Sequence, residues 1–144
     1  MTATTFEPSA RQPLRIGLWT AQVLLAVAFC GIGLMKLTTP IPELAASMKW
    51  PGEYSSTFVR FIGLIDLLGG LGILLPALTR VLPRLSILAA LGCTVLQVLA
   101  IGFHLSRGEA GVLPLNFVLL ALSVFVLWGR SRRVPIVPRI WDAS

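Results

Sequence analysis

Among the side chains that can carry charge or form hydrogen bonds within or at the edges of the long apolar stretches of this 144-residue chain, six are candidates for chemistry. Polar groups inside such stretches are costly to bury, so they usually face a protein interior or a water-filled cavity. Each is therefore a candidate for ligand binding or proton transfer. The six are Lys36, Arg60, Asp66, Gln97, His104 and Asn116.

Within this set His104 is the natural proton carrier, because an imidazole titrates near neutral pH, and Asp66 would orient it or exchange charge with it. Lys36 and Arg60 supply two cations against this one anion. Either a loop carboxylate such as Glu43 or an anionic or carbonyl-bearing ligand then balances the charge. The pattern predicts a pocket for a small amphipathic ligand. Alternatively, Asp66 pairs with Lys36 or Arg60, and His104 and Asn116 complete a structural network that holds the helices in register.

The segments that carry these residues have the length and composition of membrane spans. The chain is 56% hydrophobic and 12% charged, with a mean hydropathy of +0.85. A helix needs about 20 residues to cross a hydrocarbon core of about 30 Å. Apolar runs of roughly this length lie at about 16–37, 58–78, 82–103 and 112–128. Because lipid offers no partner for open backbone groups, we predict an all-α integral membrane four-helix bundle in one domain, 15–129.

The basic residues predict the orientation of this bundle. With a cytoplasmic N-terminus, that side holds eight arginines against two acidic residues, and the other side balances at four against four. Lys and Arg are enriched on the cytoplasmic side, so both termini are expected there, with a loose tail at 1–14. A basic tail at 130–144 would rest against anionic headgroups. We interpret the eight arginines as a topology signal and no more. They are Arg11, Arg15, Arg80, Arg84, Arg130, Arg132, Arg133 and Arg139.

Periodicity predicts which faces of the spans point inward. Small and polar residues recur on the third span at steps of 4, 3, 4, 3 and 4, which is one helix face: Ser86, Ala90, Cys93, Gln97, Ala100 and His104. Large apolar residues, Phe103 among them, occupy the opposite face. On the first span Lys36 shares a face with Gln22, Phe29 and Gly33, and on the fourth span Asn116 shares one with Ser123.

The outer connection at 38–57 is long enough to be more than a link. Within it, Glu43–Trp50 is expected to form a short helix that caps the bundle, with Trp50 and Tyr54 at the membrane interface. The second outer loop, Leu105–Gly111, is too short for such a role.

Other kinds of site agree poorly with the sequence. Cys30 and Cys93 lie on separate spans and form no C-x-x-C, which argues against a redox dithiol. A haem between helices needs two axial ligands, so His104 would need Met35, Met48 or a second copy of the chain. No cluster has zinc-like spacing, and no metal ligands are predicted. Nucleic acid is excluded, because its binders carry basic residues on a solvated face.

Several motifs resemble those of the DoxX-like membrane proteins. The resemblance covers roughly residues 14–128. It depends more on the order of Lys, Arg with an acidic residue, His and Asn along the chain than on any one motif. Asp66 departs from the family pattern, where Glu is more frequent. The motifs are Gly31-Ile-Gly-Leu-Met-Lys36-Leu, the run from Arg60 to Pro76 that contains Asp66, His104 followed by Arg107-Gly108-Glu109, and Pro114-Leu-Asn116.

The resemblance implies a four-helix bacterial inner-membrane protein associated with redox assemblies, including quinone-linked ones. Three functions follow as hypotheses. The first is a membrane subunit that binds a quinone-like ligand and works with a redox partner protein. The second is a non-enzymatic assembly or partner-binding protein whose polar cluster is structural. The third is a small-solute carrier, which would need a homo-oligomer because four helices are few for alternating access. The sequence contains no self-contained catalytic apparatus, and enzymatic activity stays open.

Overall fold

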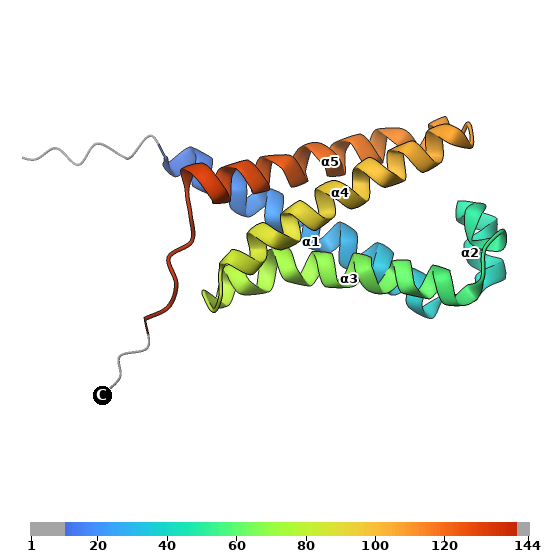
Figure 1. Cartoon of the computed structure of the whole chain (residues 1–144), viewed down its shortest axis with the longest axis horizontal. Coiled ribbons are helices and arrows are strands. Elements are labelled where there is room, and N and C mark those ends of the chain that lie inside the picture. The colour runs from blue at the N-terminus through green and yellow to red at the C-terminus, as the bar shows by residue number, and fades with distance from the viewer. Residues whose placement is uncertain (1–10, 141–144) are drawn as a thin grey trace, which may run out of the picture.

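The computed structural model describes residues 11–140, which contain helices, turns and coil but no strand. Figure 1 shows four long helices running side by side, with a short helix across one end. The long helices are α1 (Gln12–Thr38), α3 (Ser56–Thr79), α4 (Arg84–Ser106) and α5 (Leu113–Trp128). The short helix is α2 (Ile41–Met48), and the single-turn elements are η1 (Trp50–Gly52), η2 (Ala110–Val112) and the π-helical η3 (Gly129–Arg133).

Four segments are long and apolar enough to cross a membrane, which confirms the predicted all-α, four-span architecture and makes lipid the environment of their outer faces. They are Gln12–Thr38, Ser56–Thr79, Arg84–Ser106 and Ala110–Arg133. The first span begins four residues before the predicted one, so residues 12–14 belong to α1 rather than to a tail. The remaining N-terminal residues 1–10, together with Trp141 and Asp142, lie outside the described part of the chain.

The two ends of the bundle differ in charge, and we call them the lid end and the basic end. At the lid end α1 and α4 finish, and α3 and α5 begin. The helix α2 with η1 lies across them, and we call these two elements the lid (Figure 1). All four acidic residues of the described chain belong to this half: Glu43, Glu53, Asp66 and Glu109. The basic end holds the eight arginines of the predicted cytoplasmic face, and which end faces the cytoplasm stays a prediction.

Small residues on the inner faces allow the long helices to approach closely. A Cβ added to Gly33 of α1 would lie 2.7 Å from the backbone oxygen of Gly63 in α3, so the two helices cross there with no room for a side chain. The inward face of α1 is confirmed, because Gln22, Phe29, Gly33 and Lys36 are all buried. Ser123 of α5 is buried as well.

The inward face of α4 agrees with the prediction through Gln97 and then rotates. Ser86, Ala90, Cys93 and Gln97 are buried, but Ile101 is the next buried residue and Ala100 is only partly covered. Phe103, which was expected to face lipid, instead packs edge-on against Trp50, with 6.1 Å between ring centroids. That expectation was wrong because the lid supplies an aromatic partner that lies outside the four spans.

The predicted capping helix is present, two residues earlier than expected, as α2 followed by η1. Pro40 starts it, because a proline disfavours a helical residue before it and so separates α2 from α1. Leu44 and Trp50 form a second apolar core with Val59 of α3. Trp50 is only 8% exposed and lies inside the lid, whereas Tyr54 is exposed, and their position at the membrane interface stays a prediction.

Arg130 corrects the interpretation of the basic residues as topology signals alone. It was expected to rest against headgroups, yet it is 2% exposed and its Nε donates to Gln22 Oε1 at 2.8 Å. The approach of η3 to α1 requires Gly129, since any Cβ there would overlap the Leu18 side chain. A buried guanidinium thus forms part of the core at the basic end.

Candidate functional site

The centre of the candidate site is an ion pair between α1 and α3. Lys36 Nζ donates to Asp66 Oδ2 at 2.7 Å, and the two residues are 9% and 4% exposed. Gly63 permits this contact, because a Cβ on it would lie 2.7 Å from Lys36 Cβ. The ammonium also lies 5.5 Å from the centroid of the Trp50 ring. The lid therefore covers the ion pair directly with an aromatic face, which is an attractive surface for a cation.

Arg60 stabilises the helix end beside this pair instead of joining it. Its Nη1 donates to the backbone oxygens of Lys36 and Thr39, the latter at 2.8 Å. The last carbonyls of a helix lack partners within the helix and carry partial negative charge, so they receive the second cation of the predicted cluster. Lys36 and Asp66 then balance each other, and Glu43 is not needed as a counter-ion.

Two buried polar atoms in the lid-end half of the described helices have no hydrogen-bond partner: Gln97 Oε1 on α4 and Asn116 Nδ2 on α5. Gln97 is 5% exposed. Such atoms are unusual, because nearly all buried polar groups in folded proteins are paired. The first is an acceptor and the second a donor, so each has an unused capacity for a hydrogen bond.

Gln97 lies at the depth of the ion pair. The adjacent inner-face contact joins Cys93 of α4 to Gly69 of α3, where a Cβ would lie 2.9 Å from the cysteine Sγ. From this contact Gln97 is four residues closer to the lid end on α4, and Asp66 is three residues closer on α3. At 1.5 Å per residue these steps are about 6 Å and about 4.5 Å along the helices. The free amide oxygen and the ion pair therefore occupy one layer of the bundle.

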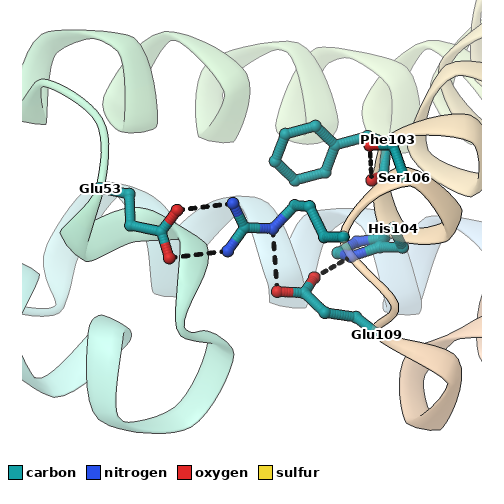
Figure 2. Close-up of polar contacts among 6 residues, drawn as sticks. Glu53, Phe103, His104, Ser106 and Glu109 are labelled. Carbon is teal, nitrogen blue, oxygen red and sulfur yellow. Dashed lines mark hydrogen bonds and ion pairs between the residues drawn. The ribbon is translucent and has the colours of Figure 1, made fainter.

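A second polar cluster, the latch, fastens the lid to the α4–α5 loop (Figure 2). Arg107 donates from Nη1 and Nη2 to Glu53 at 2.6 and 2.8 Å, and from Nε to Glu109 Oε1 at 2.9 Å. His104 Nδ1 lies 2.6 Å from Glu109 Oε2. Because a carboxylate only accepts, this nitrogen carries the hydrogen. The latch comprises Glu53, His104, Arg107 and Glu109.

The hydrogen bonds of the latch favour the charged forms of Glu53, Arg107 and Glu109. The hydrogen bond from His104 is the main cause that holds the pKa of Glu109 below its usual value, with Arg107 adding to it. The hydrogen bond from Arg107 likewise lowers the pKa of Glu53, and the two glutamates raise the pKa of Arg107. The carboxylates are therefore ionised at neutral pH, and the lid is held closed by opposite charges.

Five of the six predicted site residues divide between these two clusters, and Asn116 of α5 joins neither, because no hydrogen bond or ion pair links its side chain to them. Lys36 and Asp66 meet, Arg60 supports them from behind, and Gln97 shares their layer. His104 contacts Glu109, so its role as a proton carrier working with Asp66 stays a prediction. The loop Leu105–Gly111, which the sequence predicts to be too short for a capping helix, supplies Arg107 and Glu109 to the latch. The signal for the latch was present in the sequence, as a charged Arg-Gly-Glu turn directly after the histidine.

The sequence was compared with models of known protein families. The model of the DoxX-like family matches residues 20–126, which is more than half of the chain and contains all six predicted site residues. The chain belongs to the DoxX-like family. Comparisons with curated proteins and with solved structures found no match. This DoxX-like chain is therefore a multi-pass membrane protein with two defined polar clusters at its lid end.

Proposed function

We propose that this DoxX-like protein is the membrane subunit of a redox-linked system and holds a quinone-like ligand beneath its lid. The observation that carries the proposal is the unpartnered Gln97 Oε1 in the layer of the Lys36–Asp66 pair, whose ammonium lies against the Trp50 ring. A quinone ring presents carbonyl oxygens that accept hydrogen bonds, and its reduced form presents hydroxyls that donate them. The Lys36 ammonium and Asn116 Nδ2 suit the first form, and Gln97 Oε1 suits the second.

The surroundings support an amphipathic ligand. The aromatic rings of Trp50 and Phe103 meet edge-on at the lid, which suits a flat ring. Exposed apolar side chains cover the outer faces of the helices, so an isoprenoid tail would continue into lipid. Reduction of a quinone to a quinol takes up two electrons and two protons. In this proposal a separate redox partner protein supplies the electrons, and His104 and Asp66 are the proton carriers.

We further propose that the protein lies in a bacterial inner membrane with both termini in the cytoplasm. The eight arginines at the basic end support this orientation through the positive-inside bias. The lid and the latch then face the opposite compartment, where the redox partner would dock.

A direct test is titration of the purified protein in nanodiscs with a short-chain ubiquinone, followed by tryptophan fluorescence. We expect saturable quenching that is largely lost in Trp50→Phe, which assigns the signal to the lid. Gln97→Leu should weaken binding about tenfold, the effect of one buried hydrogen bond. Cys93→Ala, one turn away on the same face, should bind as the wild type does. Absence of saturable quenching, or equal binding by the Gln97 and Cys93 variants, would contradict the proposal.

An assembly protein with a structural polar cluster is the second candidate. The observation in its favour is that the Lys36–Asp66 pair and the latch are complete without any ligand. This function predicts that substitutions of Lys36 or Asp66 reduce the amount of folded protein in the membrane and the recovery of a partner in equal proportion. Loss of ubiquinone binding at normal abundance would favour the first candidate instead.

A further inference from the structure

At the basic end, far from the lid, Arg130 is fixed by contacts from several elements. Its Nε donates to Gln22 Oε1 at 2.8 Å and its Nη1 to the backbone oxygen of Val134 at 3.2 Å. Its guanidinium lies 4.9 Å from the centroid of the Trp19 ring. Gln22 in turn donates from Nε2 to the backbone oxygen of Ile73 at 2.8 Å. Arg130 is thus an ordered part of the core rather than a mobile surface charge.

The charge of Arg130 is not neutralised by the described chain. The residue is only 2% exposed, and its Nη2 is buried without a hydrogen-bond partner. The four acidic residues of the described chain all lie in the lid-end half. Arginine stays protonated in proteins, and a buried charge without a counter-ion is strongly unfavourable. An anion from outside the described chain would supply both the missing acceptor and the missing countercharge.

Arg130 lines a cavity of about 610 Å³ that has room for such an anion. Arg84, at the start of α4, lies on the same cavity, is exposed and has no partner of its own in the described structure. The positive end of the α4 dipole adds to the attraction for an anion there. The rest of the lining is mostly apolar: Leu82, Pro83, Ile87, Ser131, Pro135, Ile136 and Pro138.

The segment after η3 closes one side of this cavity. Pro135, Ile136 and Pro138 belong to it, and it is tied back to the α3–α4 turn by a hydrogen bond from Arg139 N to Arg80 O at 3.0 Å. The cavity consequently has cationic groups from α4 and η3 and an apolar wall from the chain that follows. Its volume lies within the range of small-molecule sites, about 300–1,000 Å³.

We infer that this cavity binds a phosphate group. Guanidinium groups match phosphate oxygens in geometry and charge, which makes arginine the preferred residue for such recognition. The apolar wall and the position at the ends of the spans favour the phosphate of an anionic phospholipid, and soluble phosphate is the other source of the same chemistry. The site is independent of the ligand proposed beneath the lid.

The test uses the full chain in detergent with equimolar phosphatidylglycerol and phosphatidylcholine, and native mass spectrometry counts the retained lipids. We expect preferential retention of phosphatidylglycerol. Arg84→Ala should reduce it about fivefold, the effect of about 1 kcal/mol per basic residue near a lipid phosphate. Arg132→Ala is the matched control, because it removes the same charge from an exposed residue that does not line this cavity. Arg84 is the main probe because Arg130→Gln alters the core and its folding.

A second arm identifies the source of the phosphate. Inorganic phosphate is titrated at constant ionic strength, and the thermal midpoint and the retained phosphatidylglycerol are measured. Stabilisation by inorganic phosphate that displaces the lipid and is weakened by Arg84→Ala assigns the site to a soluble anion. Retention of lipid unaffected by phosphate assigns it to the phospholipid. Equal retention of both lipids without stabilisation by phosphate, or equal losses for Arg84→Ala and Arg132→Ala, would overturn the inference.

Discussion

The two ends of the bundle each bury a cation, but they satisfy it differently. At the lid end Lys36 meets a carboxylate at 2.7 Å, so the pair is neutral within the chain. At the basic end Arg130 receives an amide oxygen, a backbone carbonyl and an indole face, and one of its nitrogens has no partner. The lid end is thus complete in charge, whereas the basic end depends on its surroundings.

The chemistry of the two side chains explains why each suits its place. A lysine ammonium is a compact charge that one carboxylate can neutralise. A guanidinium carries five N–H donors in a plane and needs several acceptors. Gln22, placed 108 residues away in sequence, supplies one of them through the packing of α1 against η3. Where acceptors from several elements converge, arginine is the appropriate residue. Its remaining donors are then available to the ligand proposed above.

The largest predicted effect comes from removing the carboxylate at the lid end. Asp66→Ala leaves the Lys36 ammonium buried and unpaired, and we expect it to lower the free energy of unfolding by about 3–5 kcal/mol. Reversible unfolding in mixed micelles with increasing dodecyl sulfate measures this. The double variant Lys36→Met with Asp66→Ala should recover most of the loss, because no buried charge remains. A single variant no less stable than the double one would show that the two charges are not coupled.

A smaller effect separates the two buried glutamines. Gln22→Leu removes the acceptor of Arg130 Nε and the donor to Ile73, so we expect a loss of about 2–3 kcal/mol in the free energy of unfolding. Gln97→Leu removes an oxygen that has no hydrogen-bond partner in the described chain, and it should change the free energy of unfolding by less than about 1 kcal/mol. The same unfolding measurement compares them. Equal losses would mean that the contacts of Gln22 contribute nothing beyond packing.

The smallest effect is a pH dependence confined to the latch. The pKa values of Glu53 and Glu109 are lower in the folded protein than the usual 4.5, so the folded state prefers their ionised forms. Their stabilising contribution is complete above pH 4.5 and is lost as the pH falls through the lowered folded values. Acrylamide quenching of Trp50, taken as the difference between wild type and Trp50→Phe, should therefore stay constant near neutral pH and rise in acid.

Replacing Arg107 provides the control for the latch. Arg107→Met removes the hydrogen bonds to both glutamates, so Trp50 should already be more accessible to acrylamide at neutral pH and change less on acidification. Arg132→Met, which loses the same charge at the basic end, should leave the accessibility of Trp50 unchanged. Identical quenching curves for the wild type and Arg107→Met would indicate that the lid is held by its apolar core alone.

The inner helix faces could be predicted from local periodicity, and the pairing of Asp66 with Lys36 was one of the two alternatives that the sequence offered, whereas the partners of the arginines could not be predicted. Spacing alone placed Gln22, Phe29, Gly33 and Lys36 on the inner face of α1, because a helix repeats every 3.6 residues. The partners of Arg60 and Arg130 are backbone oxygens and an amide from distant segments, which no spacing rule identifies. Phe103 was misassigned for a similar reason, since its aromatic neighbours belong to the lid.

The contact between Arg139 and Arg80 has a consequence for biosynthesis. The apolar wall of the basic cavity is translated only after the fourth span, whereas Gln22 and Arg84 are made much earlier. During membrane insertion Gln22 therefore cannot accept its hydrogen bond from Arg130 until α5 has been inserted and η3 has been translated. The final step of folding at this end is then the closure of residues 134–140 over the α3–α4 turn, and a stop codon or cleavage before residue 134 would leave four inserted helices with an open basic end.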